Sequence, residues 1–152
     1  MASEHHKALH RFSSGLDVIE SIEGRNTIYS ANISLTMAKI QYALRDYKKS
    51  IHLYERSLDI YSQIMGYGHP YCLRIYANLI FVCFESGHTE KALEIAGRLI
   101  KMIKEMVNIF ESGDNNFLKN NSEVFTMLNE IGNIYRKNEF FQEALTFYET
   151  AL

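Results

Sequence analysis

The stretch that decides the fold is residues 66–100, which read GYGHPYCLRIYANLIFVCFESGHTEKALEIAGRLI. It opens with a loop from Gly66 to Pro70, and two segments rich in apolar residues follow. Within these segments the apolar residues recur every three or four positions, as they do on one face of a helix. Gly87 lies where the first helix would end, and Thr89 is a candidate cap for the next one. The stretch therefore predicts two helices joined by a tight turn.

The same pattern returns along the rest of the chain. Ala8, Ser50 and Ala92 begin equivalent dipeptides that lie 42 residues apart, and a further copy starts 52 residues later at Ala144. Self-similarity with a period of about 20 to 50 residues is typical of repeat arrays. We therefore expect an all-α fold, an α-α superhelix of antiparallel helix pairs with about seven helices.

Breaks in the apolar pattern divide the chain into segments. Helices are expected at 4–22, 27–44, 47–65, 70–85, 90–110 and 122–137, with a seventh from about residue 140. These helices predict a single array with four parts and one insertion: the second helix of an incomplete unit at 4–22, complete units at 27–65, 70–110 and 122–152, and an inserted loop at 111–121. Because the pattern starts and stops within a unit, we expect a fragment of a longer array or half of an assembly.

Composition narrows the possible functions. The 152 residues include one Pro, and 16 basic against 18 acidic residues give a formal net charge of -2. Nucleic-acid binders usually carry a basic surplus, so nucleic acid is not an expected partner. No apolar run is long enough for a signal core or a membrane span, and the expected location is therefore cytoplasmic, with a nuclear location also possible.

Cysteine and histidine residues do not form a recognisable chemical site. Cys72 and Cys83 lie eleven positions apart in one predicted helix, too far apart to form a disulfide, and Cys83 occupies a core position. His6 and His10 are one helical turn apart, but no further ligand set accompanies them. Nucleophile and phosphate-binding motifs are also missing from the sequence. We expect no catalytic residue, no metal and no cofactor.

These residues resemble the tetratricopeptide repeat family. The best-fitting unit carries Ile131-Gly132, Tyr135, Phe141, Ala144, Tyr148 and Ala151-Leu152 at the family's spacing. The loop from Gly66 to Pro70, followed by Asn78-Leu79, is similar to the kinesin light chain type of repeat, whose unit is also 42 residues long. This resemblance concerns the type of repeat and does not make the chain a kinesin subunit.

The resemblance implies a concave groove that binds a protein or peptide ligand. Mapping the family's groove positions gives Asn32, Leu35, Thr36, Lys39, Arg74, Ala77, Asn78, Phe81, Thr126, Asn129, Glu130 and Asn133. The residues expected to contact a partner are Asn32, Leu35, Lys39, Arg74, Asn78, Phe81, Asn129 and Asn133. An Asn amide both donates and accepts hydrogen bonds, so it can hold the backbone of an extended peptide. Glu130 places a negative charge where a carboxylate clamp for chaperone tails needs a positive one.

The most direct interpretation is an interaction module, a part of a larger scaffold or adaptor. Two alternatives remain open. The array could be the non-catalytic arm of a larger enzyme, or it could be an assembly element that forms a homo-oligomer through its uncapped terminal helices.

Overall fold

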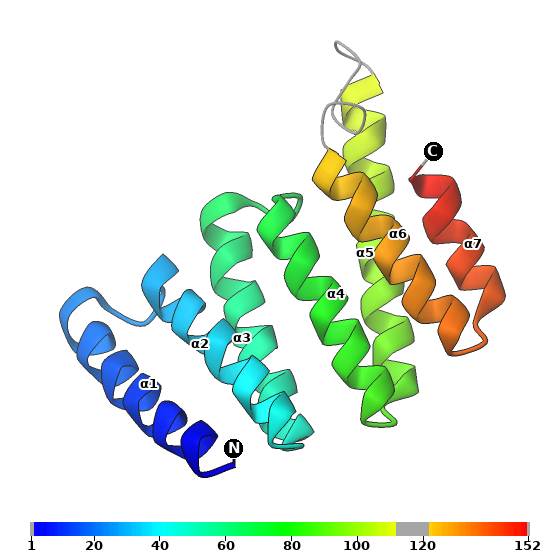
Figure 1. Ribbon diagram of the computed structural model, residues 1–152. Helices are drawn as coiled ribbons and strands as arrows, with labels where there is room; N and C mark the ends of the chain where they lie inside the picture. The colour runs from blue at the N-terminus through cyan, green and yellow to red at the C-terminus, as the bar shows by residue number, and fades with distance from the viewer. Residues whose placement is uncertain (1, 112–121, 152) are drawn as a thin grey trace. The chain divides into compact units, whose positions relative to one another are not determined.

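The structure, a computed structural model, describes residues 2–111 and 122–151 and contains seven α-helices in these ranges (Figure 1). The helices are α1 (Ala2–Glu23), α2 (Ile28–Ala43), α3 (Tyr47–Met65), α4 (Pro70–Glu85), α5 (Thr89–Glu111), α6 (Ser122–Lys137) and α7 (Phe141–Thr150). The predicted helices begin and end within about two residues of these bounds. Apart from Glu111, which ends α5, the expected inserted loop lies outside the described residues.

Consecutive helices form antiparallel pairs, α2 with α3, α4 with α5, and α6 with α7 (Figure 1). The predicted all-α fold of helix pairs is confirmed. Contacts group the helices into two compact units, Met1–Gly66 with α1 to α3 and Tyr67–Leu152 with α4 to α7. The division of the chain into one half repeat and three full repeats, which rests on the 42-residue period of the sequence, remains a proposal.

Helix ends follow the signals that the sequence carries. Gly24, Gly66 and Gly87 have φ angles of 90°, 83° and 76°, a region that favours glycine, and each follows the end of a helix. Pro70 lies in the first turn of α4, as expected. One prediction is wrong: Thr89 is the first residue of α5 rather than its cap, because the Ala92 N–H already donates to the His88 carbonyl at 3.1 Å.

Small side chains allow α2 and α3 to pack closely. The Ser57 hydroxyl donates to the Ala31 carbonyl at 2.9 Å, and the Ser50 hydroxyl donates to the Ala38 carbonyl at 2.8 Å. All four residues are buried. Ser34, on α2, is also buried, and its hydroxyl has no hydrogen-bond partner among the described residues.

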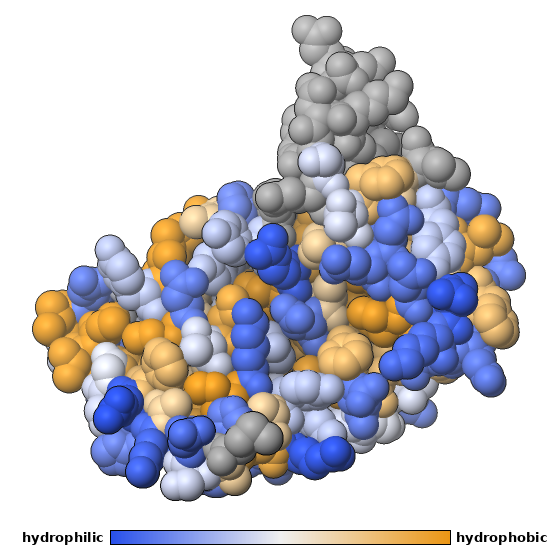
Figure 2. Space-filling view, viewed as in Figure 1, coloured by the Kyte–Doolittle hydropathy of each residue, from blue (hydrophilic) through white to orange (hydrophobic). Residues whose placement is uncertain are grey.

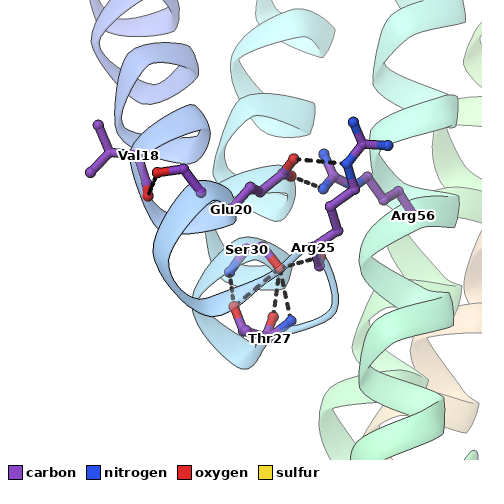
Figure 3. A network of polar contacts seen from close by, with 7 residues as sticks. Val18, Glu20, Arg25, Thr27, Ser30 and Arg56 are labelled. Carbon is purple, nitrogen blue, oxygen red and sulfur yellow. Dashed lines mark hydrogen bonds and ion pairs between the residues drawn. The ribbon is translucent and has the colours of Figure 1, made fainter.

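A polar network ties α1 to the pair that follows it (Figure 3). Glu20 of α1 forms an ion pair with Arg56 of α3, and its other carboxylate oxygen lies 3.5 Å from Nε of Arg25 in the turn after α1. In the same turn, Thr27 caps α2: its hydroxyl oxygen accepts the Ser30 N–H at 3.1 Å. α1 therefore has polar as well as apolar attachments to its unit.

Aromatic residues fill the core of the second unit. Tyr135 of α6 is fully buried, and its hydroxyl donates to the Ala92 carbonyl of α5 at 2.8 Å. The Phe84 ring meets the Tyr135 ring edge-on at a centroid distance of 5.1 Å. Cys72 and Cys83 are buried and form no disulfide, as predicted, and burial raises the pKa of Cys72 to about 11.

Candidate partner-binding surface

One face of α4 carries three of the expected groove residues. Arg74, Asn78 and Phe81 follow one another at steps of four and three residues, so they share a helix face. Arg74 is exposed, and Asn78 and Phe81 are partly exposed. α4 also contacts α6, which carries the expected residues of the next repeat. The second unit therefore brings five expected residues onto two neighbouring helices.

Asn78 differs from the other asparagines of the predicted groove. Within residues 2–111 and 122–151, the Asn78 side-chain amide makes no hydrogen bond. Its donor and its acceptor are both available, although the residue is half-buried. A half-buried amide of this kind gains most from a partner that satisfies it.

The other three asparagines use part of their hydrogen-bonding capacity within the fold. The Tyr61 hydroxyl donates to Oδ1 of Asn32 at 2.6 Å, and the Tyr148 hydroxyl donates to Oδ1 of Asn133 at 2.9 Å. Nδ2 of Asn129 donates to the carbonyl of Phe125 at 3.0 Å. Asn32 and Asn133 each therefore also hold the two helices of their own pair together.

The expected residues of α2 belong to the first compact unit. Asn32 and Lys39 are exposed there, and Leu35 is partly exposed. Of the further mapped positions, Ala77 is wrong as a groove residue, because it is 7% exposed and belongs to the core. Thr126 and Glu130 of α6 are exposed.

Tyr71 lies on the same α4 face, but it is not among the groove residues that the sequence predicts. It is 49% exposed, it precedes Arg74 by three residues, and the Arg74 guanidinium lies 5.9 Å from the centre of its ring. The His69 ring stacks against Tyr71 at 5.5 Å. The helical spacing from Arg74 back to Tyr71 was a signal that could have identified it. Tyr71 and Arg74 are residue types that often dominate binding energies.

The described part of the chain contains no group of three or more His, Cys, Asp or Glu residues placed to bind a metal ion. His6 Nδ1 lies 2.7 Å from the carbonyl oxygen of Ala2, within its own helix. None of the described helices combines the length and the apolar character that a membrane span needs.

Comparison with known proteins identifies the repeat. A family model described as tetratricopeptide repeat matches residues 29–105. The chain belongs to the tetratricopeptide repeat family. The matched residues run from α2 into α5, and the resemblance to the tetratricopeptide repeat family that the sequence predicts is confirmed.

Two solved structures share this tetratricopeptide repeat fold. BtubC (BKLC) from P. vanneervenii aligns with a TM-score of 0.69 and 16% identity, over 98% of this chain and 56% of that one. A putative kinesin light chain with nearly identical TPR-like repeats from Podosopora anserina aligns with a TM-score of 0.73 and 13% identity, over 98% of this chain and 66% of that one. This chain thus spans less than two thirds of either structure. No curated protein sequence gives a significant match.

Proposed function

We propose that this tetratricopeptide repeat chain is a non-catalytic protein-interaction module that binds an extended peptide segment of a partner on the first helices of its repeats. The observation that carries the proposal is the unpaired, half-buried amide of Asn78, which lies between Arg74 and Phe81 on one face of α4. In this proposal Asn129 and Asn133 of α6 supply further contacts within the second unit, and Asn32, Leu35 and Lys39 of α2 are the proposed contacts of the first unit.

The chemistry of the α4 face suits a peptide backbone. Asn78 can donate to a peptide carbonyl and accept from a peptide N–H at the same time, which fixes an extended chain without dictating its side chains. Phe81 offers apolar surface for one side chain of the ligand. Arg74 can pair with a carboxylate, and its contact with Tyr71 restrains the guanidinium before binding.

The test begins with peptides selected from a random displayed library on immobilised residues 1–152. The affinity of the selected peptide is then measured by titration calorimetry for the wild type and for Asn78→Ala with Phe81→Ala. We expect the double variant to bind at least tenfold more weakly, which corresponds to about 1.4 kcal/mol.

The matched control replaces Glu94 and Arg98 of α5 by alanine. These two residues form an exposed ion pair on another helix, with 3.6 Å between a guanidinium nitrogen of Arg98 and Oε1 of Glu94. The control variant should therefore bind the peptide as tightly as the wild type. Circular dichroism should show unchanged helicity for both variants. If the Asn78 and Phe81 variant binds the peptide as tightly as the control, the proposal is wrong.

The wider setting is also proposed from the family. We propose a scaffold or adaptor role in the cytoplasm, within a larger protein, because tetratricopeptide repeats generally bind proteins or peptides. If the chain is instead the non-catalytic arm of a larger enzyme, its α4 face would bind a peptide in the same way. That peptide binding would then serve the catalytic part of the larger protein. An assembly role depends instead on the exposed faces of α1 and α7.

A further inference from the structure

α1 exposes apolar side chains on the face that its own unit leaves uncovered. Val18 is 56% exposed and Ile22 is 76% exposed, and four residues separate them, so they are neighbours on one helix face. Ser14 and Arg11 continue this exposed face toward the N-terminus of the helix. We call Arg11, Ser14, Val18 and Ile22 the α1 face. Figure 2 shows hydrophobic side chains gathered over the end of α1 and the turn that follows it.

α7 carries a stripe with the same spacing. Phe141 is 65% exposed and Leu145 is 46% exposed, and Glu149 follows four residues later as an exposed charge. We call Phe141, Leu145 and Glu149 the α7 face. Within residues 2–111 and 122–151, neither Glu149 nor Arg11 forms an ion pair. Each face therefore carries two exposed apolar residues and one charge that has no ion-pair partner among the described residues, and the two charges are opposite.

We propose that the α7 face of one copy of this chain binds the α1 face of a second copy, with the two helices antiparallel. Residues 141, 145 and 149 then lie opposite residues 22, 18 and 14, because both sets advance by four residues, or about 6 Å, per step. Phe141 meets Ile22, and Leu145 meets Val18. Glu149 comes opposite Ser14, within reach of the long Arg11 side chain one turn further along.

Charge favours this arrangement over the other helix pairings. A parallel alignment that matches Phe141 with Val18 and Leu145 with Ile22 would place Glu149 opposite residue 26, beyond the end of α1 and away from Arg11. An antiparallel pairing of α7 with α7 can match Phe141 with Leu145, but it leaves Glu149 without an opposite charge on the partner helix, because α7 contains no Lys or Arg. Of these arrangements, the antiparallel pairing of α1 with α7 brings apolar residues together and also brings opposite charges together.

The contact joins two different faces, so a dimer keeps a free α1 face on one copy and a free α7 face on the other. Such head-to-tail contacts extend into chains or close into rings. Single helices on each side bury less than the roughly 1,200 Å² that is typical of stable complexes. The association should therefore be weak, reversible and dependent on protein concentration and on salt.

Sedimentation velocity of residues 1–152 from micromolar to millimolar concentration at low salt tests the proposal. The wild type should increase in mass with concentration. Val18→Asp with Ile22→Asp removes the α1 face, and Phe141→Asp with Leu145→Asp removes the α7 face. Each of these variants alone should stay monomeric. An equimolar mixture of the two should form dimers and nothing larger, because one intact face of each kind remains in the mixture.

A charge exchange tests the pairing of Arg11 with Glu149. Arg11→Glu alone and Glu149→Arg alone should each weaken self-association about three- to tenfold. The variant that carries both changes should recover it, since the exchanged charges again meet between copies. Arg98→Glu on α5 is the matched control and should leave self-association unchanged.

Three outcomes would overturn the proposal: a wild type that is monomeric at every concentration, an α1-face variant that still self-associates alone, or a double charge exchange that fails to recover association. The substituted residues are exposed, and circular dichroism should confirm that each variant is folded. The peptide selected on the α4 face should bind all of these variants equally, which separates this proposal from the proposed function.

Discussion

Buried serines determine how closely α2 approaches α3. Ser50 and Ser57 satisfy their hydroxyl groups on carbonyls of α2, whereas the hydroxyl of Ser34 is buried without a partner among the described residues. A buried hydroxyl that lacks a hydrogen bond lowers stability, and a satisfied one raises it. Chemically identical side chains in one interface are therefore expected to have opposite effects on the free energy of unfolding.

Ser34→Ala should raise the free energy of unfolding by about 1 kcal/mol, because it removes an unsatisfied polar atom. Ser57→Ala should lower that free energy by about 1 kcal/mol, because the Ala31 carbonyl loses a donor. Urea denaturation followed by circular dichroism measures both values. Equal losses for the two variants would show that the Ser34 hydroxyl has a role that this packing does not explain.

Asp46 makes the start of α3 dependent on pH. Its carboxylate accepts the Lys49 N–H at 3.2 Å and pairs with the Lys49 ammonium at 2.8 Å. The side-chain hydrogen bond with Lys49 holds the pKa of Asp46 below its usual value of 3.8. A carboxylate with a lowered pKa contributes stability above its unfolded-state pKa and loses that contribution as the pH falls through its lower folded-state pKa.

Asp46→Ala should therefore destabilise the protein at pH 7 by about 0.5–2 kcal/mol, the usual cost of a lost helix cap. The difference from the wild type should shrink as the pH falls below 3.8. Asp46→Asn keeps the cap acceptor without the charge, and it should cost less at neutral pH. Denaturation curves at several pH values give these differences, and a difference that stays constant down to pH 2 would contradict the assigned role.

At the scale of helices, close approach of the backbones requires the smallest residues. A Cβ atom added to Gly132 of α6 would lie 2.6 Å from Cε1 of Tyr148 on α7. The same Tyr148 is held by its hydrogen bond to Asn133, so its ring has little freedom to move aside. Gly132 therefore sets the distance between α6 and α7.

Gly132→Ala should lower the free energy of unfolding by about 1–3 kcal/mol, despite the better helix propensity of alanine. Gly97→Ala is the matched control in a helix interior, because no atom lies within 4 Å of an added Cβ there. That change should stabilise the protein by about 0.5–1 kcal/mol. Thermal and urea melts of the two variants compare these effects, and a shift of the same sign in both would refute the close contact at Gly132.

At the scale of the whole molecule, two compact units each have buried residues of their own. Ala31, Ala38 and Ile51 are buried in the first unit, and Tyr135 and Phe147 are among the fully buried residues of the second. In repeat proteins, stability is close to a sum of contributions from each repeat and from its contacts with adjacent repeats. Parts of the chain can therefore fold without the whole.

Residues 1–66 and 67–152, produced separately, should each show the circular dichroism spectrum of a helical protein. Their spectra, weighted by length, should add up to most of the spectrum of residues 1–152. The shorter fragment should have the lower melting temperature, because a smaller chain buries a smaller fraction of its surface. An unfolded 67–152 fragment would show that the second unit depends on the first.

The helices themselves could be predicted because their signals are local. A glycine that must adopt a positive φ angle, such as Gly66, a proline such as Pro70 and the apolar spacing act within a few residues of the chain. The 42-residue period also predicts that the helices form pairs, since only a stacked array buries the same face in every repeat. Thr89 shows the limit of such signals, because the helix begins one residue before the expected position.

The candidate site was only partly predictable. The sequence by itself determined the all-α repeat, the core cysteines that form no disulfide, and the spacing that places Arg74, Asn78 and Phe81 on one face of α4. Only the tertiary structure decided how those residues differ, because a hydrogen bond between helices depends on distances that no local pattern encodes. Tyr61 and Tyr148 occupy the amide oxygens of Asn32 and Asn133, while the amide of Asn78 stays unpaired among the described residues.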